Sequence, residues 1–343
     1  MHLLLRRVRR HALEARPGRN VAHSPLVDRG RPTADRRFFS GGGLLAFLLL
    51  LAAGCRPEGP AAPPAAPLVP DDAPLVYVDS LPWDPAVRPL PEDPALAEQV
   101  RYGLRLMRET PALAPAYVGN ALTCGNCHLN AGQREGALPL VGIAGLFPQY
   151  RARDGRLVSL EDRIRGCFLR SMDGTAPPYD SPELLALSAY ITWLSEGQPV
   201  GEVPAWRGRN VIPAEARLPI EALDTARGGQ LYAQQCAPCH GADGQGVDLG
   251  IAKPGPLWGP DSWNDGAGAA RIYTLAGFVR HAMPLSAPGL LSDEEAQHVA
   301  AFINAHPRPS YPDKGADYPG AEVPVDAVYD TRRYPEHPLR LPD

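Results

Sequence analysis

Two short stretches of this 343-residue chain decide its fold: Cys124-Gly-Asn-Cys127-His128 and Cys236-Ala-Pro-Cys239-His240. Both have the form Cys-x-x-Cys-His, in which two thiols one helical turn apart reach the two vinyl groups of one haem. The adjacent His then faces the iron as its proximal ligand. The sequence therefore predicts two covalently attached haem c groups.

Other uses of closely spaced cysteines explain these two runs less well. A redox-active pair does not need a His after both copies, and a disulfide needs none at all. A zinc site needs further Cys or His at knuckle spacing, which the sequence does not contain. With four cysteines assigned to haem, Cys55 and Cys167 are left over.

Residues 1–54 have the features of an export signal. The apolar run LLAFLLLLAA at 44–53 follows Arg36 and Arg37 and is too short for a comfortable membrane span. It leads into small residues and Cys55, which resembles a bacterial lipoprotein cleavage site although the usual Leu stands one place too far upstream. We therefore expect an exported or periplasmic protein, with lipidation of Cys55 or plain cleavage, and a Pro- and Ala-rich tether over 55–90.

The net charge of −4 hides an uneven distribution. Residues 1–54 hold ten Arg and three acidic residues, so the remainder has 24 basic and 35 acidic residues and a net charge of −11. No basic run survives there that could follow a phosphate backbone, which argues against a nucleic-acid partner.

Residues 224–308 follow the pattern of the small class I cytochrome c fold. A first helix runs into the second motif, another helix ends at Met283-Pro284, and a capping box from Ser292 to Glu295 opens a last helix. His240 is then the proximal ligand and Met283 the distal one. His281, two residues earlier, is the alternative distal ligand. Residues at i and i+2 of a helix cannot both face the iron, so only one of the two can bind it. The Met-Pro context favours Met283.

Residues 91–200 repeat this order, with helices expected near 94–109 and 181–196 around the first motif. The predicted fold is therefore mainly α, with two class I cytochrome c-like domains in tandem, each with one covalent haem c. A linker over 201–223 joins them, and an extended tail covers 309–343. No Met-Pro occurs in the distal region of the first domain, which contains Cys167 instead.

If this distal segment is helical, Arg163, Cys167 and Ser171 share one face. A thiol near ferric haem would bind it as thiolate, flanked by two anion-binding donors. Alternatives stay open for each residue. Cys167 could be a small buried residue, with Met172 as distal ligand; Arg163 and Arg165 could be solvated or pair with haem propionates; Ser171 could simply end the helix.

At these residues the chain resembles the thiosulfate dehydrogenases, dihaem cytochromes that couple two thiosulfates into tetrathionate. The resemblance covers about residues 90–308 and is carried by four segments: TCGNCHLNAG at 123–132, RIRGCFLRSMDG at 163–174, CAPCHGADGQG at 236–246, and HAMP at 281–284. The segment around Cys167 is the specific part, because Cys-x-x-Cys-His alone matches any cytochrome c.

The resemblance implies ligands, substrate contacts and partners. It makes His128 and Cys167 the axial pair of the active-site haem, and His240 and Met283 the pair of the electron-transfer haem. Substrate contacts fall on Arg153, Arg163 and Ser171. Cys167 would leave the iron or react at its sulfur, and electrons would pass to an external acceptor such as a small cytochrome. Some members run as tetrathionate reductases, and some carry a Lys where this chain has Ala282.

Two rival functions remain at this level. A membrane-tethered dihaem electron carrier without its own substrate explains both motifs but leaves Cys167 and its face without a role. A subunit of a sulfur-oxidising complex with a Cys-ligated haem would need a partner protein for activity. A carrier should show only Met- or His-ligated haems and no thiosulfate turnover.

Overall fold

The computed structural model describes residues 89–249 and 254–327, all within the compact unit formed by residues 62–343. The predicted export signal over 1–54, Cys55 and the tether up to residue 88 lie outside the described residues. Within the described ranges, no helix is long and apolar enough to cross a membrane.

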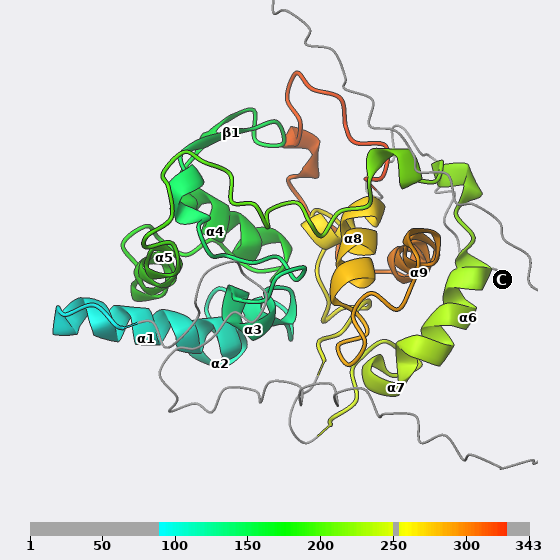
Figure 1. Ribbon diagram of the computed structural model, residues 1–343, viewed down its shortest axis with the longest axis horizontal. Helices are drawn as coiled ribbons and strands as arrows, with labels where there is room; N and C mark the ends of the chain where they lie inside the picture. Colours follow the sequence, from blue (N-terminus) through cyan, green and yellow to red (C-terminus); the bar gives the residue numbers. More distant parts are fainter. Residues whose placement is uncertain (1–88, 250–253, 328–343) are drawn as a thin grey trace, which may run out of the picture. The chain divides into compact units, whose positions relative to one another are not determined.

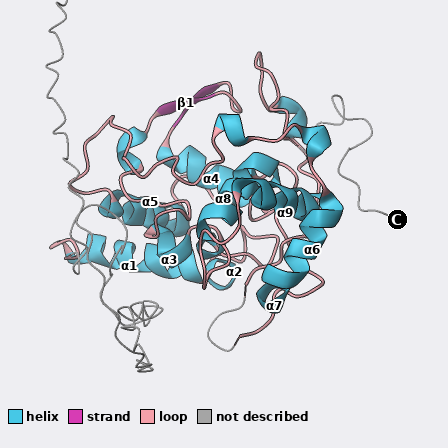
Figure 2. Cartoon of the chain, turned by 45° about the vertical axis from the view of Figure 1, so that its right-hand side comes forward, coloured by secondary structure: helices cyan, strands magenta, loops and turns pink. Residues whose placement is uncertain are grey.

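This part of the chain is mainly helical, as the sequence predicts (Figure 1). The α-helices are α1 (Pro94–Arg108), α2 (Thr110–Leu113), α3 (Leu129–Gly132), α4 (Leu160–Arg170), α5 (Pro182–Leu194), α6 (Thr225–Gln235), α7 (Ala237–His240), α8 (Ile272–Ala282) and α9 (Asp293–Ala305). Single 3-10 turns lie at Cys124–Asn126, Ala144–Leu146, Ala214–Ala216, Ile220–Ala222, Gly268–Ala270 and Lys314–Ala316. The strands β1 (Gln149–Arg151) and β2 (Arg156–Val158) form an antiparallel hairpin (Figure 2).

Side-chain caps fix where the longer helices begin. Ser292 and Glu295 form the predicted capping box at the start of α9, with Glu295 N 3.2 Å from Ser292 Oγ and Ser292 N 2.9 Å from Glu295 Oε2. Ser181 caps α5, whose first residue is a proline, by accepting from Leu184 N at 3.3 Å. These caps satisfy backbone donors that a helix cannot pair by itself.

In each half of the described chain, a first helix crosses a last helix at a glycine. A Cβ on Gly103 of α1 would lie 2.3 Å from the carbonyl oxygen of Ala186 on α5. A Cβ on Gly228 of α6 would lie 2.1 Å from the carbonyl oxygen of His298 on α9. Only glycine permits this backbone approach, so two small residues set both crossings.

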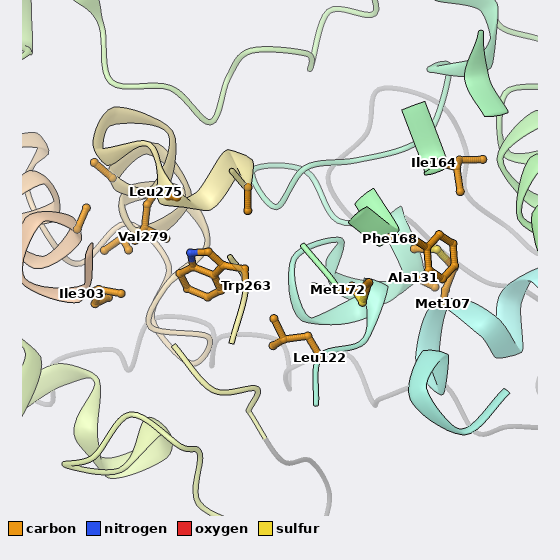
Figure 3. Packing of buried hydrophobic residues seen from close by; sticks show 14 of the residues in the cluster. Met107, Leu122, Ala131, Ile164, Phe168, Met172, Trp263, Leu275, Val279 and Ile303 are labelled. Atoms are coloured by element: carbon orange, nitrogen blue, oxygen red, sulfur yellow. The ribbon is translucent and has the colours of Figure 1, made fainter. Parts of the chain in front are cut away.

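The buried face of α4 packs into the apolar core. Phe168 and Met172 lie beside Met107 and Ala131 (Figure 3), and Phe168 and Met172 are 1% and 4% exposed. Burial of side chains of this size contributes about 1.5–3 kcal/mol each. This packing holds the adjacent face of α4, which carries Arg163 and Cys167, in a fixed orientation.

A C-terminal strap, residues 310–327, lies against both halves. Asp317 makes a two-pronged ion pair with Arg170 at the end of α4, at 2.6 and 2.8 Å. Asp326 accepts from Arg271, which precedes α8, at 2.6 and 3.0 Å. The strap therefore connects α4 with the start of α8.

Candidate active site at Cys167

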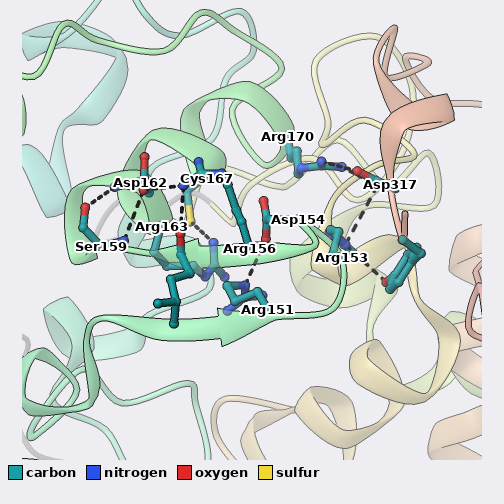
Figure 4. Close-up of polar contacts among 12 residues, drawn as sticks. Arg151, Arg153, Asp154, Arg156, Ser159, Asp162, Arg163, Cys167, Arg170 and Asp317 are labelled. Atoms are coloured by element: carbon teal, nitrogen blue, oxygen red, sulfur yellow. Dashed lines mark hydrogen bonds and ion pairs between the residues drawn. The ribbon is translucent and has the colours of Figure 1, made fainter. Parts of the chain in front are cut away.

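Cys167 lies on α4, directly after the β-hairpin in the chain (Figure 4). The helix begins at a capping box: Asp162 N donates to Ser159 Oγ at 3.1 Å, and Ser159 N donates to Asp162 Oδ2 at 3.2 Å. One turn before Cys167, Arg163 donates from Nη1 to Cys167 Sγ at 3.0 Å. A guanidinium this close stabilises negative charge on the sulfur.

The first Cys-x-x-Cys-His motif lies within electrostatic reach of Cys167. Burial raises the pKa of Cys124 to about 11 and that of Cys127 to about 12, and the negative charge of Cys167 adds to both shifts. Burial also lowers the pKa of His128 to about 4, with a further contribution from Arg163. The structure thus brings together the motif, Cys167 and Arg163, which the sequence predicts to share one site.

His128 is held in one tautomer by a backbone contact. Its Nδ1 lies 2.6 Å from the carbonyl oxygen of Leu138. A carbonyl can only accept, so Nδ1 carries the proton, and Nε2 of the neutral ring keeps its lone pair. This is the state in which imidazole binds a metal.

Ser171 caps the C-terminus of α4 rather than lying inside it. Its backbone N donates to the carbonyl oxygen of Cys167 at 2.8 Å, and its own carbonyl accepts from Asn120 Nδ2 at 2.8 Å. Ser171 therefore lies one helical turn after Cys167, at the spacing that the sequence predicts.

Comparisons with known proteins agree with this arrangement. Residues 117–200 match the SoxA/TsdA cytochrome c domain, and residues 223–303 match cytochrome C oxidase, cbb3-type, subunit III. A thiosulfate dehydrogenase of Allochromatium vinosum is 47% identical over 240 residues, which cover 68% of this chain and 86% of that protein. The chain belongs to the thiosulfate dehydrogenase family.

Further relatives extend the match. A thiosulfate dehydrogenase of Stutzerimonas stutzeri is 44% identical over 230 residues, covering 66% of this chain and 73% of that one. The solved thiosulfate dehydrogenase (TsdBA) of Marichromatium purpuratum aligns with a TM-score of 0.63 and 37% identity over 70% of this chain. This chain spans about half of that solved chain, 53% of its length. Both cytochrome c domains and the family imply haem c and an oxidoreductase.

The donor set of this thiosulfate dehydrogenase family member fits haem c. Cys124, Cys127, Cys236 and Cys239 are all unpaired thiols. In the second half, Trp263 Nε1 and Arg308 Nε are buried donors without an acceptor among the described residues, and the guanidinium of Arg308 stacks 4.8 Å from the Trp263 ring. Buried donors of this kind suit an anionic acceptor, which a haem propionate provides.

The second motif spans the end of α6 and the short α7. Burial lowers the pKa of His240, whose Nδ1 has no hydrogen-bond partner within the described residues. Met283 caps α8, its backbone N donating to the Val279 carbonyl oxygen at 3.2 Å, whereas His281 lies within the helix. Met283 and His281 therefore lie at the end of one helix, and the sequence preference for Met283 as ligand stays a prediction.

Arg153, which the family resemblance places at the substrate, lies against the strap. It donates from Nη1 to the Gly266 carbonyl oxygen at 2.9 Å and from Nε to Tyr318 Oη at 3.2 Å, and its Nε lies 3.9 Å from Asp317 Oδ2. Figure 4 shows its side chain directed away from Cys167, towards Asp317. The structure does not bring Arg153 together with Arg163 and Cys167.

Two arginines that the sequence analysis did not single out lie near Arg163 instead. Burial lowers the pKa of Arg151, and the charge of Arg163 lowers it further, while Asp154 and Cys167 oppose the shift. Partial desolvation and the charge of Arg163 also lower the pKa of Arg207 in the linker, although Arg207 is an exposed residue. Arg151 is the last residue of β1 and lies opposite Arg156 of β2, the strand that leads into α4, and no motif in the sequence marks it.

Proposed function

We propose that this protein oxidises two thiosulfate ions to tetrathionate, using two haem c groups held in two tandem cytochrome c domains. The observation that carries the proposal is the Arg163–Cys167 contact of 3.0 Å beside the first haem-binding motif. A thiol paired with a guanidinium is suited to reacting with an anionic sulfur compound. Relatives named thiosulfate dehydrogenase support the choice of substrate.

We propose that His128 and Cys167 would hold the iron of the first haem, and that His240 and Met283 would hold that of the second. The tautomer of His128 supports its role, because Nε2 is left free to bind iron. The rival ligand Met172 is buried in the core with 4% of its surface exposed, which favours Cys167. Thiolate lowers and Met raises a haem potential, so this pairing suits electron flow from the first haem to the second.

The side chains at the site have separate roles in the reaction. Two thiosulfate dianions lose two electrons in total while one S–S bond forms, and no proton is exchanged. When bound, the haems supply the acceptors for those two electrons. Arg163 offsets the charge of the substrate, and the Ser171 hydroxyl donates to its sulfonate end.

The Cys167 thiolate would form an S–S bond with the sulfane sulfur of a first thiosulfate, and the two electrons that this oxidation releases would pass to the acceptors that the bound haems supply. A second thiosulfate then attacks that sulfane sulfur, forming the central S–S bond of tetrathionate and breaking the bond to Cys167. Cys167 leaves as the thiolate, which the guanidinium of Arg163 stabilises. The same side chains serve the reverse reaction, so tetrathionate reduction uses this site as well.

The remaining partners are proposed from the sequence. Electrons leave to an external acceptor such as a small cytochrome. Export through residues 1–54, with possible attachment to a membrane through a lipidated Cys55, places the protein in the periplasm or outside the cell.

Turnover by the purified holoprotein tests the proposal. With thiosulfate as donor and a small cytochrome c as acceptor, we expect one tetrathionate for every two thiosulfates consumed and two acceptors reduced. An electron carrier without its own substrate would leave thiosulfate unchanged. A subunit of a sulfur-oxidising complex would turn over only after its partner protein is added.

A further inference from the structure

The second half of the described chain contains a buried arginine, Arg308, just after α9. Its Nε is buried and has no acceptor in that part of the chain. Its other donors bond to neutral carbonyl oxygens, Nη2 to that of Ile303 at 2.8 Å and Nη1 to that of Leu257 at 3.4 Å. None of the ion pairs within residues 89–249 and 254–327 includes Arg308.

A buried cation without a counter-ion strongly destabilises a fold. Burial lowers the pKa of Arg308 to about 10, so its guanidinium is still charged at neutral pH. The charge of Asp265 opposes this lowering, but Asp265 itself accepts from Lys314 Nζ at 2.7 Å. By contrast, the well-buried Arg170 has its own carboxylate in Asp317. Arg308 therefore needs an anion from outside the polypeptide.

A second buried donor lies beside this guanidinium. The guanidinium carbon of Arg308 is 4.8 Å from the centre of the Trp263 ring, and Trp263 Nε1 also has no acceptor among the described residues. Figure 3 shows the indole nitrogen directed towards Leu275 and Val279 of α8. One charged and one neutral donor, close together and shielded from water, match the two acceptor oxygens of a carboxylate.

Contacts of Arg308 connect it with the second haem-binding motif. Leu257, whose carbonyl accepts from Arg308, donates its own backbone N to the Gly244 carbonyl oxygen at 2.8 Å. Gly244 follows His240 of the motif by four residues. The helix α8, on whose side the indole nitrogen lies, ends at Met283. A haem attached at this motif brings its propionate carboxylates into the same half of the chain.

We propose that Arg308 and Trp263 bind one propionate of the second haem, and that the charge of Arg308 sets the reduction potential of that haem. Ferric iron carries one more positive charge than ferrous iron, so an uncompensated propionate favours the ferric state. Arg308 offsets that charge and raises the potential. It is a positioning residue rather than a catalytic one. The inference rests on the proposed function only for the presence of the second haem.

A redox titration of the full-length holoprotein with mediators, in the absence of thiosulfate, tests this assignment. At about pH 8 a propionate stays ionised even if the variant raises its pKa. At a fixed solution potential, Arg308→Gln should lower the ratio of ferrous to ferric second haem at least about 10-fold. This corresponds to about 59 mV for a one-electron couple. Arg308→Lys keeps the charge and should stay within about 3-fold of wild type.

Two references control for indirect effects. Arg227 lies in the same half but is 45% exposed and pairs with Glu294, so Arg227→Gln should stay within about 2-fold of wild type. The first haem is an internal reference, because thiolate ligation gives it the lower potential. Its transition should not move in any of these variants.

A ratio for Arg308→Gln within about 2-fold of wild type would overturn the assignment. So would an equal fall in Arg227→Gln, or a shift of the lower-potential transition instead of the higher one. If Arg308→Gln does not retain its haems, Trp263→Phe decides. It removes only a neutral donor and should lower the ratio about 3-fold, and an unchanged ratio would contradict the proposal.

The titration also separates this inference from the proposed function, because it contains no thiosulfate. A protein that shows the predicted shifts but does not oxidise thiosulfate supports the propionate site and contradicts the proposed function. Normal turnover by wild type, with no shift in Arg308→Gln, contradicts only the propionate site.

Discussion

At the scale of single residues, the site depends on which side chains α4 presents on its two faces. Ile164 and Phe168 face the core, and Arg163 and Cys167 face the first haem-binding motif. Arg165, two residues after Arg163, turns elsewhere: its Nε donates to the Pro177 carbonyl oxygen at 2.9 Å and its guanidinium stacks 4.1 Å from the Tyr179 ring. The two arginines therefore provide a test and its control on the same helix.

We predict that Arg163→Gln lowers kcat/KM for thiosulfate by about 10- to 100-fold, because it removes the charged donor to Cys167 Sγ and to the substrate. Arg165→Gln should remain within about 3-fold of wild type, since its partners lie away from Cys167. Steady-state kinetics of both holoproteins measures the difference. An equal loss of kcat/KM in the two variants would contradict a specific role for Arg163, and would mean that activity depends only on the overall positive charge of α4.

At the scale of elements, α4 depends on how it begins. Asp162 accepts from Ser159 N, from Arg156 Nη1 at 2.8 Å and from the hydroxyl of Tyr179. The Arg156 contact is the largest cause of the lowered pKa of Asp162, with Tyr179 and the Ser159 backbone contributing. The carboxylate thus joins the hairpin, the helix start and the loop before α5.

Asp162→Asn should lower the free energy of unfolding by about 1 kcal/mol at neutral pH, since Arg156 is exposed and the pair is partly screened. The pKa of a paired carboxylate is lower in the folded state, so its stabilisation is complete above the ordinary value of 3.8. It is lost as the pH falls below that value. Denaturant unfolding measures the difference in free energy of unfolding between variant and wild type. This difference should be smaller at about pH 3 than at pH 7.

The exposed Asp180 provides the control for this measurement, because Asp180→Asn changes the charge without changing a helix cap. A difference for Asp162→Asn that does not change with pH would show that shape, not charge, accounts for the contribution of Asp162.

At the scale of the whole molecule, the end of α4 is held by segments far away in sequence. Asn264 donates to the Leu169 carbonyl oxygen at 2.9 Å and to Asp173 Oδ1 at 2.8 Å, and Asn120 donates to the carbonyls of Ser171 and Ser262. The Asp317–Arg170 pair joins the strap to the same helix end. Cys167 is therefore positioned by contacts from both halves of the described chain.

Asp317→Ala should destabilise the protein by about 3 kcal/mol, because it leaves Arg170 mostly buried without its carboxylate. The side chains of Asp317 and Arg170 are 5% and 14% exposed. For a protein of this size we expect the thermal midpoint to fall by about 6–12 °C. The exposed Asp313, in the same strap, is the control; a fall for Asp313→Ala equal to that for Asp317→Ala would contradict a specific role for the buried pair.

Local patterns were enough to predict part of this molecule. Residues close together in sequence were enough to predict four features: the two motifs, the capping box at Ser292, the mainly helical fold, and the spacing of Arg163 and Cys167. The direction of Arg153 does not, because it depends on Tyr318 and Asp317, more than 160 residues away. Single-sequence reasoning cannot anticipate such long-range partners.

The central claim is that Cys167 takes part in the chemistry. The most direct test mixes thiosulfate with oxidised holoprotein and follows haem reduction in wild type and in Cys167→Ala. We predict that wild type is reduced and forms tetrathionate, whereas the variant, still carrying its haems, is reduced at least about 100-fold more slowly. Reduction of Cys167→Ala at the wild-type rate would contradict the account and leave Cys167 a structural residue.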